Sequence, residues 1–315
     1  MVAPRCALKQ ADEAMTPRLA GEGHVRSTDC PVSPRKAVVA SIVVASTCIW
    51  SAPQSLAAPS RCAGPFVAAA PGSLPLAGAP EVAGVALPTG RPLTERVLWV
   101  TDAPVNDRAG QLWADLAERF ADTGLWPVFL ASPLPFVEWL TPTTQSEHTE
   151  VPDGEAVLRR GWSELVEMFA DDPPIPLEPF SSEFPGLAAA QSHCAYDALA
   201  IVAEELVGGH LGLVAVRRPA DVPVALGWTG GTMLTEEPAD VASVLRSWED
   251  RFGAYLYSIG HEDAWLVVER PPKSGDDLAR FWAEQLAFNH WPLMWDDWTS
   301  LVETPVGPLL YLSWD

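Results

Sequence analysis

The chain has 315 residues, of which 48% are hydrophobic and 19% are charged, and its formal net charge is −21. This length and composition fit a globular protein with one large domain or two ordinary ones. Residues 1–73 carry seven Lys or Arg and four Asp or Glu, so residues 74–315 carry a net charge of −24. Such a surface repels phosphate backbones, which disfavours direct nucleic-acid binding. A cationic partner and a solvated acidic surface are both compatible with it.

The first 73 residues contain a segment with the order of parts found in a secretory signal. The basic pair Arg35-Lys36 precedes an apolar run from Ala37 to Trp50, and small residues follow as far as Ala58. The run is too short to span a bilayer comfortably, and more than thirty residues precede it. Two interpretations stay open: residues 1–73 are a disordered or spurious leader, or residues 35–58 are a genuine signal.

Cysteine usage divides at the same place. The chain has five cysteines, and Cys194 alone lies after residue 73. One cysteine cannot close a bridge within residues 74–315, so we expect a protein of a reducing compartment. The predicted location is the cytoplasm, and the alternative is export if the segment at 35–58 is a signal. We expect no membrane segment in residues 74–315.

Residues 74–174 read as an N-terminal α/β lobe. Its expected elements are a strand at 96–101, a helix at 108–122 ended by Gly124, a strand at 126–130, and a helix at 155–170 capped by Asp153. The first strand, helix and strand have the spacing of a parallel, right-handed βαβ unit. No glycine-rich phosphate loop follows the first strand, so this unit is not a nucleotide-binding fingerprint.

A proline-rich stretch at 171–192 predicts a linker, and residues 175–210 are interpreted as this linker plus a helix at 195–207. The elements expected after it are a strand at 211–217, a helical turn from Pro219, a helix at 238–252, strands at 254–259 and 264–269, helices at 274–289 and from Pro292, and a strand at 309–313. The two middle strands form an antiparallel hairpin. In the helix at 238–252, Val241, Val244, Leu245, Trp248 and Phe252 form one apolar stripe.

These patterns predict an α+β fold, in which amphipathic helices pack on a mixed sheet that includes the C-terminal hairpin. Residues 74–315 form either one composite domain or two lobes.

Several groups of residues near the C-terminus carry a resemblance to a known family. They are Ala225 to Gly230, Val244 to Ala254, Glu269 to Pro272, Ala283-Glu284, Ala287-Phe288 and Trp314-Asp315. In this order they resemble the bacterial family called Domain of Unknown Function 4253, clearly over residues 211–315 and weakly back to residue 74. The family commonly has Cys-Pro-Asp where this chain has Asn289-His290-Trp291, so cysteine chemistry is not expected here. The resemblance implies a C-terminal domain at 211–315 and a fold class, but no mechanism.

Arg246, Glu249 and Arg251 are the candidate catalytic residues. On a helix, Arg246 can reach Glu249 and Asp250, three and four positions on. One interpretation is a structural network of ion pairs. The other is an anion-binding arginine with Glu249 as the general base.

Trp228, Gly230 and His290 are the candidate ligand-binding residues. Trp228 and Gly230 lie in a glycine-rich turn, where the indole could either stack on a ligand or anchor the turn in the core. His290 lies near Asp296 and Asp297, and the tryptophans at 291, 295, 298 and 314 form either core or an exposed patch. Two weaker clusters are His261-Glu262-Asp263 and His193-Cys194 with Asp197.

No Walker loop, nucleophile elbow or paired Cys-x-x-Cys motif is present in the sequence, and we expect neither a metal nor a cofactor. The leading hypothesis is a non-catalytic module that binds an unknown protein or small molecule. The alternative is a hydrolase-like enzyme with an arginine–carboxylate site formed by Arg246, Glu249 and Arg251.

Overall fold

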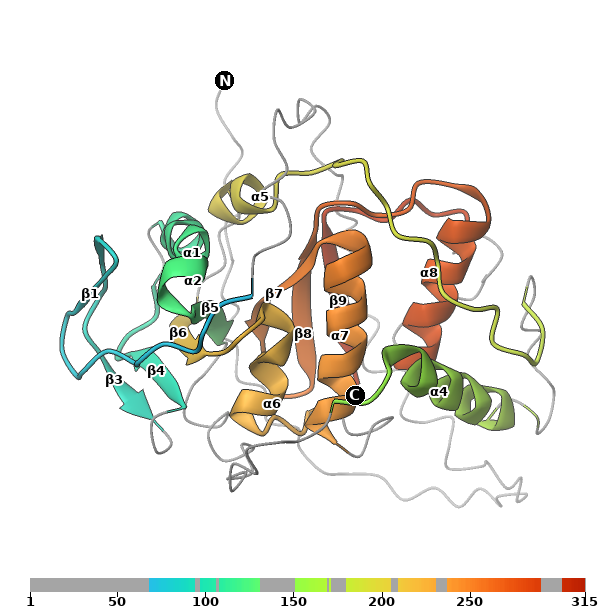
Figure 1. Cartoon of the computed structure of the whole chain (residues 1–315), viewed down its shortest axis with the longest axis horizontal. Helices are drawn as coiled ribbons and strands as arrows, with labels where there is room; N and C mark the ends of the chain where they lie inside the picture. Colours follow the sequence, from blue (N-terminus) through green and yellow to red (C-terminus); the bar gives the residue numbers. More distant parts are fainter. Residues whose placement is uncertain are drawn as a thin grey trace, which may run out of the picture. The chain divides into compact units, whose positions relative to one another are not determined.

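The computed structural model describes residues 68–93, 97–105, 108–130, 151–168, 170, 180–204, 209–230, 237–289 and 302–314. All of them belong to one compact unit within residues 52–315. Its framework is a seven-stranded sheet, accompanied by a short two-stranded hairpin (Figure 1). The predicted α+β class with a mixed sheet is confirmed.

The sheet combines strands from distant parts of the chain. In spatial order they are β3 (Gly90–Leu93), β4 (Leu98–Thr101), β6 (His210–Ala215), β5 (Leu125–Leu130), β7 (Ala254–Ile259), β8 (Asp263–Val268) and β9 (Leu309–Ser313). Among the described strands, β5 and β7 form the one parallel pairing, and every other pairing is antiparallel. The separate hairpin consists of β1 (Glu81–Val82) and β2 (Val85–Ala86).

The predicted βαβ unit needs a correction. Strands β4 and β5 run in the same direction but do not pair, because β6 lies between them and is antiparallel to both. Leu211, Leu213 and Val214 of β6 are fully buried, as a strand in the middle of a sheet requires. Strands from both sides of the predicted linker therefore interleave in one sheet, and the proposed domain boundaries stay a prediction.

Helices cover the sheet and each other. They are α1 (Ala109–Glu118), α2 (Phe120–Thr123), α4 (Gly154–Met168), α5 (Ala198–Glu204), the 3-10 turn η3 (Pro219–Asp221), α6 (Val222–Leu226), α7 (Pro238–Phe252) and α8 (Gly275–Phe288). The single helix predicted at 108–122 is two helices, because the chain leaves helical geometry at Arg119. Asp153 accepts a hydrogen bond from the Glu155 amide, as expected, at 3.3 Å. Ser274 occupies the N-cap of α8, but its side chain makes no capping bond.

Helix α7 matches its prediction at both ends. Pro238 occupies its first turn, and Gly253 ends it in the left-handed conformation with φ 60°. The predicted apolar stripe faces inward, and Trp248 has 0% of its surface exposed. The Trp248 ring packs edge-to-face on Phe288 at 5.2 Å and contacts Phe281 at 6.1 Å, so the stripe joins α7 to α8.

Helix α4 packs against both α7 and α8 (Figure 1). An ion pair between Arg160 and Asp240 links it to the first turn of α7. Gly161 allows the approach to α8, because a Cβ atom added there would lie 2.0 Å from the backbone oxygen of Ala287. No helix among the described residues is long and apolar enough to cross a membrane. The helix predicted from Pro292 lies outside the described residues.

The close contact at Gly161 gives a stability prediction. Replacing Gly161 with Ala should lower the free energy of unfolding by about 1–3 kcal/mol, because α4 must move away from α8. This figure of about 1–3 kcal/mol is the net loss, because the steric cost exceeds the roughly 1 kcal/mol by which alanine is more favourable than glycine in a helix. Urea unfolding of the variant measures the difference.

Ser163→Ala is the matched control, because Ser163 is exposed on the same helix. It should leave stability nearly unchanged. A Gly161→Ala variant as stable as the parent would show that α4 does not sit against α8 as described.

Candidate functional site

Arg246 does not pair within its own helix. Its Nε atom donates a 2.6 Å hydrogen bond to Oδ1 of Asp221, at the end of η3. The predicted pairing of Arg246 with Glu249 and Asp250 is therefore wrong. Asp221 precedes α6 directly, so this bond holds the η3–α6 turn against α7.

Glu249 is buried and pairs with Arg218, which follows β6. Its Oε1 accepts a 3.1 Å hydrogen bond from Arg218 Nε, and its Oε2 accepts one of 3.1 Å from the Ala220 amide. Arg218 also donates at 2.5 Å to the exposed carboxylate of Asp250. One arginine thus serves two adjacent carboxylates of α7.

Burial dominates the electrostatics of this group and raises the pKa of Glu249 to about 7. The charge of Arg218 and the hydrogen bond from Ala220 act in the opposite direction but do not offset burial. For Arg218, burial opposes the charged form, yet the hydrogen bond to Asp250 and the charges of Glu249 and Asp250 leave its pKa raised. Arg218 therefore stays charged, and it stays paired with Asp250 when Glu249 takes up a proton.

Arg251 belongs to a third group, centred on Glu284 of α8. Its guanidinium donates to both carboxylate oxygens, at 2.8 and 2.5 Å. Trp248 Nε1 and the Ala188 amide donate to the same carboxylate, each at 2.8 Å. Glu284 is 0% exposed, and these four donors satisfy it fully.

The three candidate catalytic residues are therefore not brought together around one cavity. Each takes part in a separate ion pair, and neither of the two pockets described below includes Arg246, Glu249 or Arg251. Their catalytic role stays a hypothesis without a convergent geometry.

The glycine-rich turn places Trp228 inside the core. The indole is 0% exposed, donates a 2.9 Å hydrogen bond to the Gly260 carbonyl, and packs edge-to-face on Trp314 at 5.4 Å. A Cβ atom at Gly230 would lie 1.9 Å from the backbone oxygen of His261, which explains the glycine there. In this structure the ring of Trp228 presents no exposed face to a ligand.

The other predicted groups of residues provide little evidence for a binding or metal site. His290, Asp296, Asp297 and the tryptophans at 291, 295 and 298 lie outside the described residues. His261 Nδ1 lies 3.6 Å from Glu262 on the exposed hairpin tip. No group of three metal-ligating side chains occurs in the part of the chain that the structure describes.

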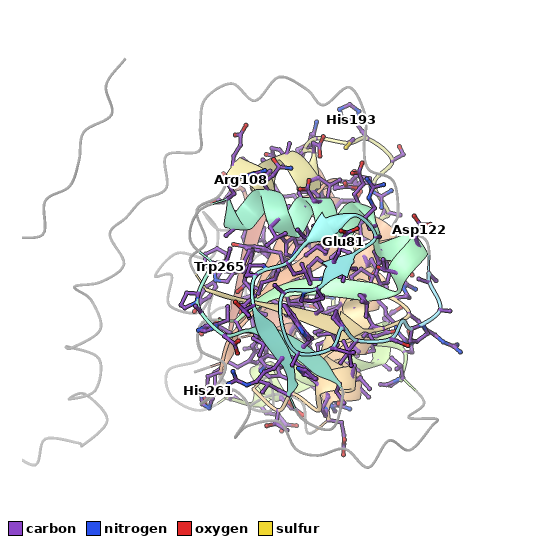
Figure 2. The ribbon with its side chains drawn as sticks, turned by 90° about the vertical axis from the view of Figure 1, so that its left-hand side faces the viewer. Glu81, Arg108, Asp122, His193, His261 and Trp265 are labelled. Atoms are coloured by element: carbon purple, nitrogen blue, oxygen red, sulfur yellow. The ribbon has the colours of Figure 1, made fainter. Side chains whose placement is uncertain are left out.

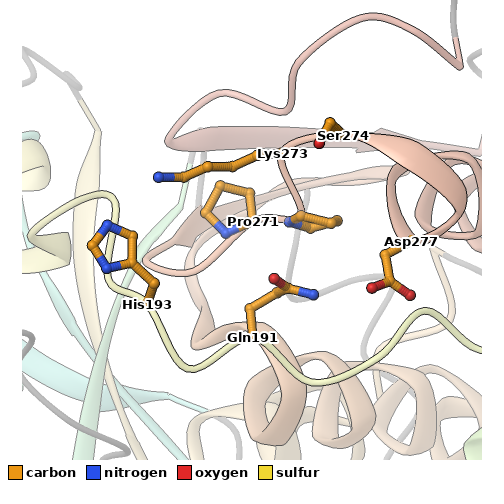
Figure 3. A pocket seen from close by; sticks show the side chains of 7 residues that line it. Gln191, His193, Pro271, Lys273, Ser274 and Asp277 are labelled. Atoms are coloured by element: carbon orange, nitrogen blue, oxygen red, sulfur yellow. The ribbon is translucent and has the colours of Figure 1, made fainter.

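His193 lines a small pocket of about 160 Å³ with Gln191, Pro271, Pro272, Lys273, Ser274 and Asp277. In Figure 3, Lys273 extends toward the side of His193, and Asp277 lies on the opposite side. Asp277 accepts a 2.9 Å hydrogen bond from the Ala189 amide, so it already anchors the chain beside α8. This pocket is below the usual size of a small-molecule site.

Cys194 requires another correction. It is disulfide-bonded, and its partner lies outside the described residues, among which Cys194 is the one cysteine. The sequence excluded a bridge only within residues 74–315, so this bridge was not predicted. The cysteine argument for a reducing compartment therefore fails, and the cytoplasmic location stays a prediction without that support.

A larger groove, of about 460 Å³, was not predicted from the sequence. One wall is the run of residues 84–88, which contains β2. The other is formed by Arg108, the residue before α1, and by Leu112 and Asp115 of α1, with Val105 beside them. Figure 2, viewed from the side of the β1–β2 hairpin, shows Glu81 of the hairpin and Arg108 at one end of α1. Arg108 has a left-handed φ of 61°, which is uncommon for a residue other than glycine.

The raised pKa of Glu249 gives a prediction about stability and pH. Between about pH 4.5 and 7 the folded protein holds a proton that the unfolded chain releases, so this group's contribution to stability falls as pH rises. The full change is about 3 kcal/mol. Glu249→Gln should remove this slope from the free energy of unfolding, measured by urea denaturation at several pH values.

Asp250→Asn is the control, since Asp250 bonds the same arginine from an exposed position and should leave the slope in place. An identical slope in the parent and in Glu249→Gln would rule out this origin.

The comparisons with known proteins concern the C-terminal half of the sheet. Neither the curated proteins nor the solved structures gave a match. The model of a family described as Domain of unknown function (DUF4253) matches residues 210–315, from the first residue of β6 through β9. The resemblance predicted from the sequence is confirmed, and the matched region contains the ion pairs of Arg246, Glu249 and Arg251 but not the groove beside α1.

Proposed function

We propose that the chain is a binding module that holds an extended segment of a partner protein in the groove between β2 and α1. The observation that carries this proposal is the pair of unlike walls, a strand edge on one side and a helix face on the other. Strand addition to an exposed edge is a common way for domains to bind peptides, since backbone hydrogen bonds supply affinity and side-chain pockets supply specificity.

The backbone of β2 supports this use of its edge. In an antiparallel pair, hydrogen-bonded and non-hydrogen-bonded residue pairs alternate. The Leu87 amide donates to the Pro80 carbonyl at 2.9 Å, so the next pair, Glu81 opposite Ala86, is non-hydrogen-bonded. The N–H and C=O of Ala86 therefore point away from β1. Residues 84–88 all line the groove, so this outward edge runs along it.

The helix wall is built by one face of α1. Leu112 and Asp115 are three residues apart on α1, which places them on the same side, and Arg108, the residue before α1, lines the groove with them. Half-buried Val85, Val105 and Leu112 give the groove an apolar floor, and its volume lies in the usual range of ligand sites. A short segment of extended chain fits these dimensions.

The rival proposal is a hydrolase-like enzyme that uses Arg246, Glu249 and Arg251. It has less support, because the three side chains belong to separate ion pairs with Asp221, Arg218 and Glu284. The raised pKa of Glu249 suits a general base, but burial beside a permanent arginine partner explains it as well.

A library of random linear peptides displayed on phage tests the binding proposal. The selected peptides should bind the parent protein and lose about tenfold or more in affinity for Ala86→Pro, because that change removes an outward N–H. Proline is tolerated at such a position on a strand edge, so the hairpin should persist. Fluorescence anisotropy with the selected peptides gives the dissociation constants.

Glu81→Pro is the matched control, since it removes the outward N–H on the opposite edge of the same hairpin. It should leave affinity unchanged. Failure to select any peptide, or equal affinity for both proline variants, would count against the groove as a site for a protein segment.

A further inference from the structure

The two ends of the helix wall carry opposite charges, and neither charge forms an ion pair among the described residues. Arg108 is exposed, and no ion pair or side-chain hydrogen bond to it occurs among the described residues. Asp115 is half-buried, and its Oδ1 accepts a 2.8 Å hydrogen bond from Gln111. No hydrogen bond within the described part of the chain reaches its Oδ2. Both side chains line the groove, so a bound segment meets a cation at one end and an anion at the other.

We infer that the segment bound in the groove carries an acidic side chain against Arg108 and a basic side chain against Asp115. This inference rests on the proposed function. The guanidinium matches a carboxylate in a bidentate geometry, and it stands at the N-terminus of α1, where the helix dipole also favours negative charge. Asp115 offers a lysine or arginine of the partner its Oδ2, which no hydrogen bond from a described residue reaches.

Geometry sets the spacing of the two charged residues. Asp115 of α1 lies seven residues after the N-cap residue Arg108, which is about 10 Å at the helical rise of 1.5 Å per residue. Side chains on one side of a strand recur every second residue, so positions two or four apart span about 7 or 13 Å. These values bracket the distance on the helix, and flexible side chains cover the difference. The acid and the base therefore lie on the same side of the segment, two or four positions apart.

Overall charge favours the basic residue further. Residues 74–315 carry a net charge of −24, so the overall field repels an acidic segment, and the groove's arginine offsets this repulsion locally. A segment with one acidic and one or more basic residues can pair its acid with Arg108, and its basic residues are attracted by the net negative charge of the protein. The attraction should weaken as salt is added.

The probes for a charge-reversal experiment are the selected peptides whose affinity falls in the Ala86→Pro variant. Replacing the acidic or the basic residue of such a peptide with Gln should weaken binding about fivefold to tenfold. Arg108→Asp should weaken the parent peptide similarly, and aspartate tolerates the left-handed φ at this position. The double variant Arg108→Asp with Asp115→Arg should prefer the peptide in which acid and base are exchanged.

Arg119→Glu is the control, because Arg119 is an exposed arginine just after α1 and does not line the groove. It should leave the preference unchanged. The inference would be wrong if peptides that need the Ala86 edge lacked this charge pattern, or if the double variant did not prefer the peptide with acid and base exchanged. Either result would leave the proposed binding function intact. A free zwitterionic amino acid serves as a competitor. If it displaces the peptides, and if its own affinity is the same for the parent and for Ala86→Pro, the occupant of the groove is not a protein segment.

Discussion

The buried ion pair between Arg251 and Glu284 is the constraint on which the C-terminal half of the structure depends. A carboxylate with no exposed surface is costly unless donors surround it, and Glu284 is surrounded by Arg251, Trp248 and the Ala188 amide. These donors come from α7 and from the irregular chain within the predicted linker at 171–192, and the carboxylate comes from α8. One group therefore fixes the relative position of three segments that are far apart in sequence.

This constraint reaches the groove through the sheet. Helix α7 ends at Gly253 and β7 begins at the next residue, so the position of α7 fixes that of β7. Strand β7 pairs with β5, and the indole of Trp126 in β5 donates a 2.7 Å hydrogen bond to Leu256 in β7. Trp113 of α1 donates at 2.8 Å to Pro127 of β5. The helix wall of the groove is thus held to the same framework as the ion pair.

The spacing of apolar residues along the sequence was enough to predict the helices and strands that bury one side. Helix α7 has an apolar stripe, a proline in its first turn and a glycine at its end, and its predicted bounds agree with the structure. Strand β9 and the β7–β8 hairpin were predicted for similar reasons. The insertion of β6 between β4 and β5 was not predicted, because a fully buried apolar strand gives no signal about its neighbours.

The candidate site was predicted less well, because it depends on contacts between distant residues. Helix spacing suggested partners for Arg246 within α7, whereas the actual partner is Asp221 on another element. Arg218 pairs with Glu249 across thirty-one positions, and nothing in either segment indicates this. The spacing of Arg108, Leu112 and Asp115 could have revealed one wall of the groove. The opposite wall depends on where the β1–β2 hairpin packs, and the sequence carries no marker of that.

A double-mutant cycle on Arg251 and Glu284 tests the central constraint most directly. Removing one partner strands the other in the core, so Arg251→Met and Glu284→Leu should each cost about 3–5 kcal/mol in the free energy of unfolding. The double variant replaces the pair with apolar side chains of similar size, and it should cost far less than the sum of the two single changes. Additive losses in the double variant would contradict the account, because they would mean that the two groups do not depend on each other.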